Sequence, residues 1–321
     1  MTFADHFETI HGPPVFTLPE PGEEAHPAAD GVAWRLDCLE AGELPFAELW
    51  RGFTDRVPST GVRALVLGPW WDGEYTELRP ALELILADAG PFPALRALFR
   101  ADVTGEECEV SWLQLTDVTP VLEAFLLLEE FGVRGDDSPG VGEEPLSLGP
   151  VRHDALRVLR FESGGLPGQV VRAVGACERP ALGHPELWLG VSRYGGDASA
   201  AGLAPVLSAG RFPALPHLGL QDGALQDELA AAVAPAPVVA QLESLSLSMG
   251  TLADVGAEAL LGGRPLTQLK RLDLHHHFLS DARADRLRTA FGSAGSEVDL
   301  SEQQTPRRRR DEEWRHVAVS E

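Results

Sequence analysis

A six-residue pattern, LxxLxL, recurs three times at one fixed spacing. It begins at Leu215, Leu242 and Leu269, so each copy starts 27 residues after the one before it. An alternating apolar run too short for a helix predicts a β-strand with one buried face, and residues 254–261, after the second copy, have helical spacing. A strand, loop and helix of this kind cannot bury their apolar face alone. Neighbouring units must therefore stack and share one continuous core.

The phase of the pattern can be followed beyond these three copies. With the fourth motif position as the marker, the series runs Trp34, Leu65, Leu98, Phe131, Leu159, Leu189, Leu218, Leu245, Leu272 and Val298. The first strand points Trp34, Leu36 and Cys38 inward and precedes a helix near residues 46–54. We therefore expect an α/β right-handed solenoid of about eight to ten parallel strands, with the sheet on the concave side and the helices on the convex side.

These features resemble the leucine-rich-repeat family, in particular its ribonuclease-inhibitor-like branch. The matching residues are the three LxxLxL copies, together with Leu252, Asp254 and Gly256 in the turn into the helix. The predicted divisions are an N-terminal cap at 1–31, a solenoid at 32–300, and a C-terminal cap or tail at 301–321. Within the caps we expect a strand at 15–18, a surface loop at 19–31, and a last strand at 314–319 preceded by a disordered loop.

More narrowly, the chain is similar to a family of cytoplasmic leucine-rich-repeat proteins from actinobacteria and enterobacteria. That resemblance implies genes beside radical-SAM enzymes, a phosphatase-like hydrolase and an ATP-grasp-like protein. It transfers no catalytic residue. A scaffold of this kind hosts many partners, so the fold alone does not define a function.

Charge and cysteine content narrow the classes of partner. The formal net charge is −23 and the pI is near 4.7, which disfavours nucleic acid or an anionic membrane as a partner. The run Arg307 to Arg310 could form a basic patch, but the acids that follow it favour a solvated charge run. Three widely spaced cysteines fit a reducing compartment. The sequence contains neither an apolar leader nor a membrane-length apolar run, so we expect a cytoplasmic protein.

Two groups of residues have the chemistry of metal ligands. His275 and His277 follow a predicted strand, with Asp273 nearby, yet a zinc site needs three or four ligands and a polar concave patch is the favoured interpretation. Asp102, Glu106, Glu107 and Glu109 could bind a cation, but they lack the spacing of a calcium loop, so a solvated loop is favoured. The neighbouring glutamates disfavour the Cys108 thiolate. We predict no metal ligand, no cofactor and no catalytic residue.

The outward positions of the predicted strands are the candidate binding surface. They are Arg134, Arg160, Glu162, Trp188, Arg193, His217, Gln221, Arg271, Asp273 and His275. Trp and Arg are common hot-spot residues in protein interfaces, which favours a protein or peptide partner. Trp70, Trp71 and Trp112 lie in two long early loops that should emerge at one edge of the sheet. There they either anchor a partner beside a positive patch of Arg134 and Arg160, or fill the core.

The third marker strand holds an arginine in an unexpected place. Its phase puts Arg100 at a leucine position. We expect Arg100 to reach solvent or to pair with Glu106, Glu107 or Glu109, because an unpaired buried guanidinium is costly.

Three functions remain open. The first is a non-catalytic scaffold that binds a protein or peptide on its concave face and adjoining loops. The second is an accessory subunit that presents a substrate to neighbouring tailoring enzymes of the radical-SAM or ATP-grasp type. The third, and the least favoured, is a metal-dependent enzyme.

Overall fold

The computed structural model describes residues 5–20, 27–137, 145–293, 295–309 and 312–320. Its centre is one eleven-stranded sheet in which every strand pairs in parallel with the next strand along the chain. The strands are β1 (Val15–Thr17), β2 (Ala33–Leu36), β3 (Ala64–Leu67), β4 (Ala97–Arg100), β5 (Glu130–Arg134), β6 (Val158–Glu162), β7 (His184–Gly190), β8 (His217–Gly223), β9 (Ser244–Ser246), β10 (Arg271–Asp273) and β11 (Glu297–Asp299).

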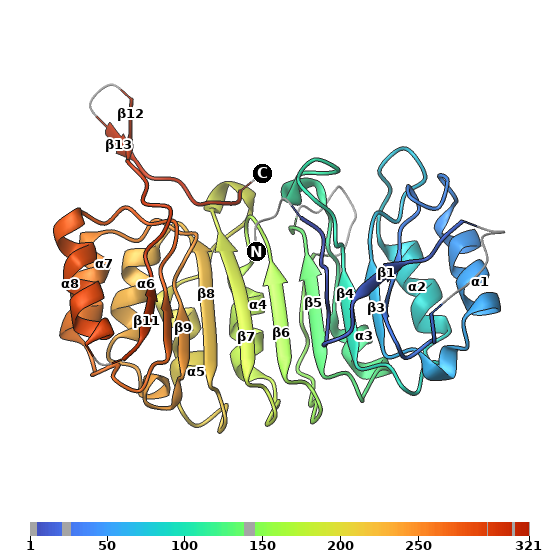
Figure 1. Ribbon diagram of the computed structural model, residues 1–321, viewed down its shortest axis with the longest axis horizontal. Helices are drawn as coiled ribbons and strands as arrows, with labels where there is room; N and C mark the ends of the chain where they lie inside the picture. Colours follow the sequence, from blue (N-terminus) through green and yellow to red (C-terminus); the bar gives the residue numbers. More distant parts are fainter. Residues whose placement is uncertain (1–4, 21–26, 138–144, 294, 310–311, 321) are drawn as a thin grey trace.

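In the described parts of the chain, eight helices connect consecutive strands, and Figure 1 shows them along one side of the sheet. They are α1 (Phe46–Arg56), α2 (Arg79–Ala87), α3 (Thr119–Ala124), α4 (Gly168–Ala176), α5 (Ala200–Leu207), α6 (Gln226–Val233), α7 (Asp254–Gly262) and α8 (Asp281–Gly292). The helices expected near residues 46–54 and 254–261 are therefore present as α1 and α7. Among the described residues, none of the helices has the length and apolar character that crossing a bilayer requires.

The strand register confirms the α/β solenoid and most of its phase. Leu218 pairs with Leu245, and Leu245 with Leu272, on adjacent parallel strands, and all three side chains are fully buried. One marker is wrong. The residue of β7 opposite Leu159 is Pro185, not Leu189, so the predicted phase of β7 is four residues too late.

The two ends of the solenoid differ from each other. Strand β1 pairs with β2 at the N-terminal edge, where a strand at 15–18 is predicted. The strand predicted at 314–319 is absent. Instead β12 (Arg307–Arg309) and β13 (Glu312–Trp314) pair as an antiparallel hairpin. The prediction of a disordered loop is therefore wrong for these two strands, and Arg310 lies outside the described residues. The loop predicted at 19–31 falls partly outside them too.

Arg100 contradicts the expectation of a paired or solvated guanidinium. It is fully buried, and none of its side-chain nitrogens has a hydrogen-bond partner among the described residues. Burial lowers its pKa to about 10, although the charge of Asp117 acts in the opposite direction. Glu107 caps the turn at Thr104 instead, accepting a hydrogen bond from the Thr104 backbone N–H at 2.7 Å.

The sheet face opposite the helices is divided into two halves. Residues 5–14, here called the N-terminal segment, cross the strands β2 to β5 in front of the sheet (Figure 1). We call this part of the sheet the covered half and the part formed by β6 to β11 the open half. Phe7 packs on Phe99 of β4, with 4.4 Å between ring centroids. The covered half is therefore occupied by the chain itself.

Candidate functional site

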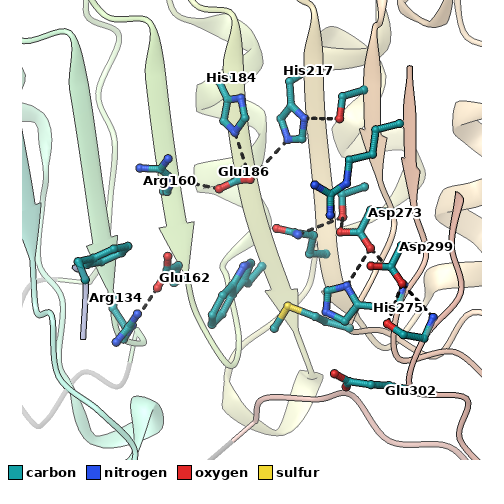
Figure 2. Close-up of a pocket in the computed structure, with 18 residues that line it drawn as sticks. Arg134, Arg160, Glu162, His184, Glu186, His217, Asp273, His275, Asp299 and Glu302 are labelled. Carbon is teal, nitrogen blue, oxygen red and sulfur yellow. Dashed lines mark hydrogen bonds and ion pairs between the residues drawn. The ribbon is translucent and has the colours of Figure 1, made fainter. Parts of the chain in front are cut away.

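The open half holds a cavity of about 530 Å³ on the sheet face (Figure 2). We call it the concave pocket. Its floor is formed by outward side chains of β6 to β11, which alternate with the buried leucines because successive side chains of a strand point to opposite faces. Its lining residues are Phe7, Arg134, Arg160, Glu162, His184, Glu186, Trp188, His217, Gln221, Ser244, Ser246, Met249, Arg271, Asp273, His275, Asp299, Ser301 and Glu302.

Both ends of the chain border the pocket. Phe7 of the N-terminal segment lines one side of it. On another side, Val319 joins Trp188 and Met249 in a small apolar cluster, and the Ala318 N–H donates to the carbonyl of Met249 at 2.7 Å. The backbone N–H of Val319 also donates to the buried carboxylate of Asp222 at 2.9 Å. The C-terminal residues are thus fixed to Asp222 of β8 and to Met249, which follows β9.

Two arginines of the pocket, Arg134 and Arg160, are neutralised by carboxylates. Arg134 is almost fully buried and its Nε donates to Glu162 Oε2 at 2.8 Å. Arg160 donates to Glu186 Oε2 at 3.0 Å and also pairs with Glu130. The predicted positive patch of Arg134 and Arg160 is therefore wrong, because every guanidinium in it faces an acid.

The predicted solvated acidic loop is also more ordered than expected at its first residue. Asp102 is fully buried and pairs with Arg35, while its carboxylate lies 3.3 Å from the backbone N–H of Phe7. Asp102 thus helps to hold the N-terminal segment on the sheet. Burial, with the charges of Glu109 and Glu107, raises the pKa of the Cys108 thiol to about 11, as its acidic neighbours predict.

Two histidines and one glutamate meet at the centre of the pocket (Figure 2). The Nε2 atoms of His184 and His217 lie 3.2 and 3.5 Å from Glu186 Oε1. The two imidazole rings stack at 3.8 Å between centroids and 11° between planes. Burial alone would raise the pKa of Glu186, but the two imidazoles and Arg160 together hold it far below its usual range. Glu186 is therefore a carboxylate throughout the physiological range.

A second group lies on β10 and β11. His275 Nδ1 is 2.8 Å from Asp273 Oδ1, and Asp299 completes a set of three possible ligand residues. The hydrogen bond to Asp273 raises the pKa of His275. Burial opposes the lowering of the Asp273 pKa, yet the contacts with His275 and Ser246 keep that pKa below its ordinary value. The side chains of Asp273 and His275 are therefore joined by a hydrogen bond.

The other histidines of the triplet do not join His275. His276 has a left-handed backbone with φ of 54°, which interrupts the alternation of the strand. His277 is buried and its Nε2 lies 3.2 Å from the carbonyl of Leu300, so its side chain does not join Asp273 and His275. Burial lowers the pKa of His277.

The remaining predicted binding residues fall in three places. Trp70 and Trp71 are 3% and 5% exposed and belong to the main core, so the core interpretation is confirmed for them and the anchor interpretation is wrong. Trp112 is 66% exposed. Arg193 lies on a short 3₁₀ turn outside the concave pocket, with its guanidinium 5.3 Å from the Tyr194 ring centroid.

Sequence reasoning missed His184 and Glu186. With Leu189 as the marker of β7, the predicted motif spans 186–191, so His184 lies before it and Glu186 takes its first, inward position. The observed marker Pro185 instead places both residues on either side of it at outward positions. One signal in the sequence could have revealed them. His184 and His217 are 33 residues apart, which is a spacing also found between marker residues of this chain, and they lie on neighbouring strands that pair in parallel.

Comparison with known proteins identifies a structural relative. No family model and no curated protein sequence matches the chain. A Bacteroides fragilis protein, solved as a structural-genomics target, is 28% identical, with a TM-score of 0.72 over 82% of this chain and 74% of that one. The two proteins are similar in fold over most of the solenoid. An internalin from Listeria monocytogenes also matches, at 16% identity and a TM-score of 0.38 over 85% of this chain and 62% of its own.

Proposed function

We propose that this protein is a binding scaffold that receives a polypeptide segment of a partner in the concave pocket. The observation that carries the proposal is the occupancy of the adjoining half of the same face. There, residues of the N-terminal segment lie across the strands and bury Phe7 and Ile10. A partner segment in the open half would continue this arrangement over β6 to β11.

The lining of the pocket favours a segment with a basic character. Asp299 and Glu302 stand at its β11 end, and Glu302 is exposed. Complementary charge acts on orientation and association rate more than on affinity. Trp188 and Met249 also line the pocket and offer apolar contact, and aromatic residues commonly supply hot spots in such interfaces.

The test uses a charge reversal with a matched control. The partner is first isolated from the native host with the tagged wild-type chain, and its affinity for purified variants is then measured by calorimetry. Glu302→Lys is expected to weaken binding by about tenfold, or roughly 1.4 kcal/mol. Glu83→Lys on the outer helix α2 makes the same change of charge on an exposed residue away from the pocket and should leave the affinity unchanged.

Equal affinities of both variants and the wild type would remove the pocket from the interface. The alternative function, an accessory subunit that presents a substrate to tailoring enzymes, uses the same pocket. The identity of the captured protein distinguishes the scaffold from the accessory subunit. For an accessory subunit, a tailoring enzyme should be captured as well, and that enzyme should modify the captured peptide.

A further inference from the structure

We propose that His184, Glu186 and His217 form a binding site for one divalent transition-metal ion, and that Zn²⁺ is the ion that this set of ligands fits best. The three residues come from adjacent strands, β7 and β8, and all point from the sheet into the concave pocket (Figure 2). Their ligand atoms lie within 4.8 Å of one another. The proposal does not rest on the partner binding proposed above.

The spacing of the donor atoms fits a coordinated ion. With zinc bonds of about 2.0 to 2.2 Å, two ligands of a tetrahedral ion are roughly 3.3 Å apart. The observed separations of Glu186 Oε1 from the two imidazole Nε2 atoms are 3.2 and 3.5 Å. An ion between them would keep these donor distances, but the two imidazole rings, now 11° from parallel, would have to tilt so that both nitrogen lone pairs point at it.

A hydrogen-bonded cluster explains the same atoms less well. A good hydrogen bond between an imidazole and a carboxylate is about 2.7 to 2.9 Å long, and His217 Nε2 is a buried atom without a hydrogen-bond partner among the described residues. Protonating both rings would place two positive charges 3.8 Å apart. A single ion shared by both rings avoids this repulsion and satisfies both nitrogen atoms.

The surroundings orient the ligands. His217 Nδ1 lies 3.0 Å from Ser244 Oγ, and a hydrogen bond at one ring nitrogen fixes which nitrogen is free to bind a metal. Arg160 holds Glu186 by Oε2, which leaves Oε1 toward the imidazoles. Arg160 also pairs with Glu130, which compensates its positive charge, so the ion does not face an unpaired guanidinium.

Three protein ligands leave the ion with an open coordination position. Sites of two histidines and one glutamate with an open position are typical of catalytic zinc centres, whereas structural sites have four protein ligands. Here the open position faces the concave pocket, where water or a donor atom of a bound molecule can reach it. The site is thus accessible to ligands from the same side as the proposed partner.

The group on β10 and β11 provides an internal control. Asp273, His275 and Asp299 also qualify by distance, but His275 Nδ1 lies 2.8 Å from Asp273 Oδ1, the distance of a good hydrogen bond. Removal of His275 therefore changes the same pocket, and removes one imidazole from it, without touching the proposed ligands.

The experiment measures Zn²⁺ binding to the full chain after treatment with a chelator and dialysis. Competition with a chromophoric chelator gives the affinity, and elemental analysis gives the number of ions per chain. We expect one ion per chain in the wild type and in His275→Ala. His184→Ala and Glu186→Gln should each weaken binding by at least about 100-fold, since loss of a residue that only hydrogen-bonds to a metal ligand already costs ~10–100-fold. His184 is 38% exposed, so its replacement should leave the fold intact.

Co²⁺ provides an independent readout, because its visible spectrum reports the ligand set. The chain has free cysteines at 38, 108 and 177, and a thiolate-to-metal charge-transfer band would reveal binding to them. We expect a Co²⁺ spectrum without that band in the wild type and no Co²⁺ spectrum in His184→Ala. The proposal is overturned if the wild type binds no ion, if His184→Ala binds as tightly as the wild type, or if only His275→Ala loses the ion.

Discussion

The covered and open halves of the concave face share one backbone arrangement and differ in the side chains that project from it. In the covered half the outward positions of β2 to β4 are apolar except Arg35, which is buried and pairs with Asp102; the apolar ones are Ala33, Ala64, Val66, Ala97 and Phe99. In the open half the corresponding positions of β7 to β11 carry imidazoles, carboxylates, hydroxyls and a guanidinium. The same repeat architecture therefore forms a surface that binds the protein's own N-terminal segment in one half and an accessible surface in the other.

The difference shows what a solenoid needs to dock a peptide on its sheet. The N-terminal segment combines an apolar floor under Phe7 with a buried charged network, in which Asp102 pairs with Arg35. Gly132 makes the floor possible, because a Cβ atom there would lie 2.4 Å from the Phe99 ring. The polar groups of the open half instead converge on one another, as His184 and His217 do on Glu186.

The largest expected effect tests whether both halves rest on one core. Leu98→Ala beneath the covered half and Leu245→Ala beneath the open half should each lower the free energy of unfolding by roughly 2 to 5 kcal/mol, because both side chains are fully buried. Neighbouring repeats share the loss. Denaturant titration measures both variants. A loss below about 1 kcal/mol in one variant only would show that the core is not equivalent in the two halves.

The next effect concerns the boundary between the halves, where Asp136 follows β5. Burial raises its pKa to about 6, against hydrogen bonds from Ser163 and Gly165. Since the unfolded pKa is about 3.9, the stability contributed by the bound proton is complete below pH ~4 and is lost as pH rises through about 6. The free energy of unfolding should therefore fall by at most roughly 3 kcal/mol across this window, at ~1.4 kcal/mol per pH unit. Asp136→Asn should remove this component, and denaturant titrations between these pH values compare the two proteins. If the free energy of unfolding changed with pH in the same way in both proteins, Asp136 would not be the source of this pH dependence.

A smaller effect isolates the N-terminal segment. Phe7→Ala should cost roughly 1.5 to 3 kcal/mol, because it exposes the apolar floor on which Phe7 packs. Hydrogen exchange should accelerate in residues 5–14 before it does in β7 to β9. Trp112→Ala is the matched control, since Trp112 is exposed and its loss should change stability by less than about 0.5 kcal/mol. Unchanged exchange in the segment would mean that Phe7 does not hold it.

The smallest effect is expected in the open half. Arg271 is an exposed residue of β10 that lines the concave pocket. Arg271→Ala should therefore change the free energy of unfolding by no more than about 0.5 kcal/mol, as is usual for surface positions. A thermal melt compared with that of Phe7→Ala measures the contrast. A loss as large as that of Phe7→Ala would show that the open half has a structural role equal to that of the covered half.

The fold was predictable from the sequence to a greater extent than the candidate site. The markers at Leu218, Leu245 and Leu272 fall on paired strands because a period of two and a constant spacing leave one way to bury the leucines. The same pattern could not locate strand β7, because a proline and not a leucine occupies its marker position. The error left His184 outside the predicted strand, put Glu186 at an inward position, and hid their convergence with His217.

The sequence by itself determined the repeat, its parallel sheet and the alternation of buried and outward residues, because these depend on local periodicity. Only the tertiary structure decided which outward residues remain accessible. Phe7 covers Phe99 although 92 residues separate them, and two histidines meet one glutamate because of the register between two strands. Contacts of this kind depend on packing between distant segments, and no periodic pattern within a segment encodes them.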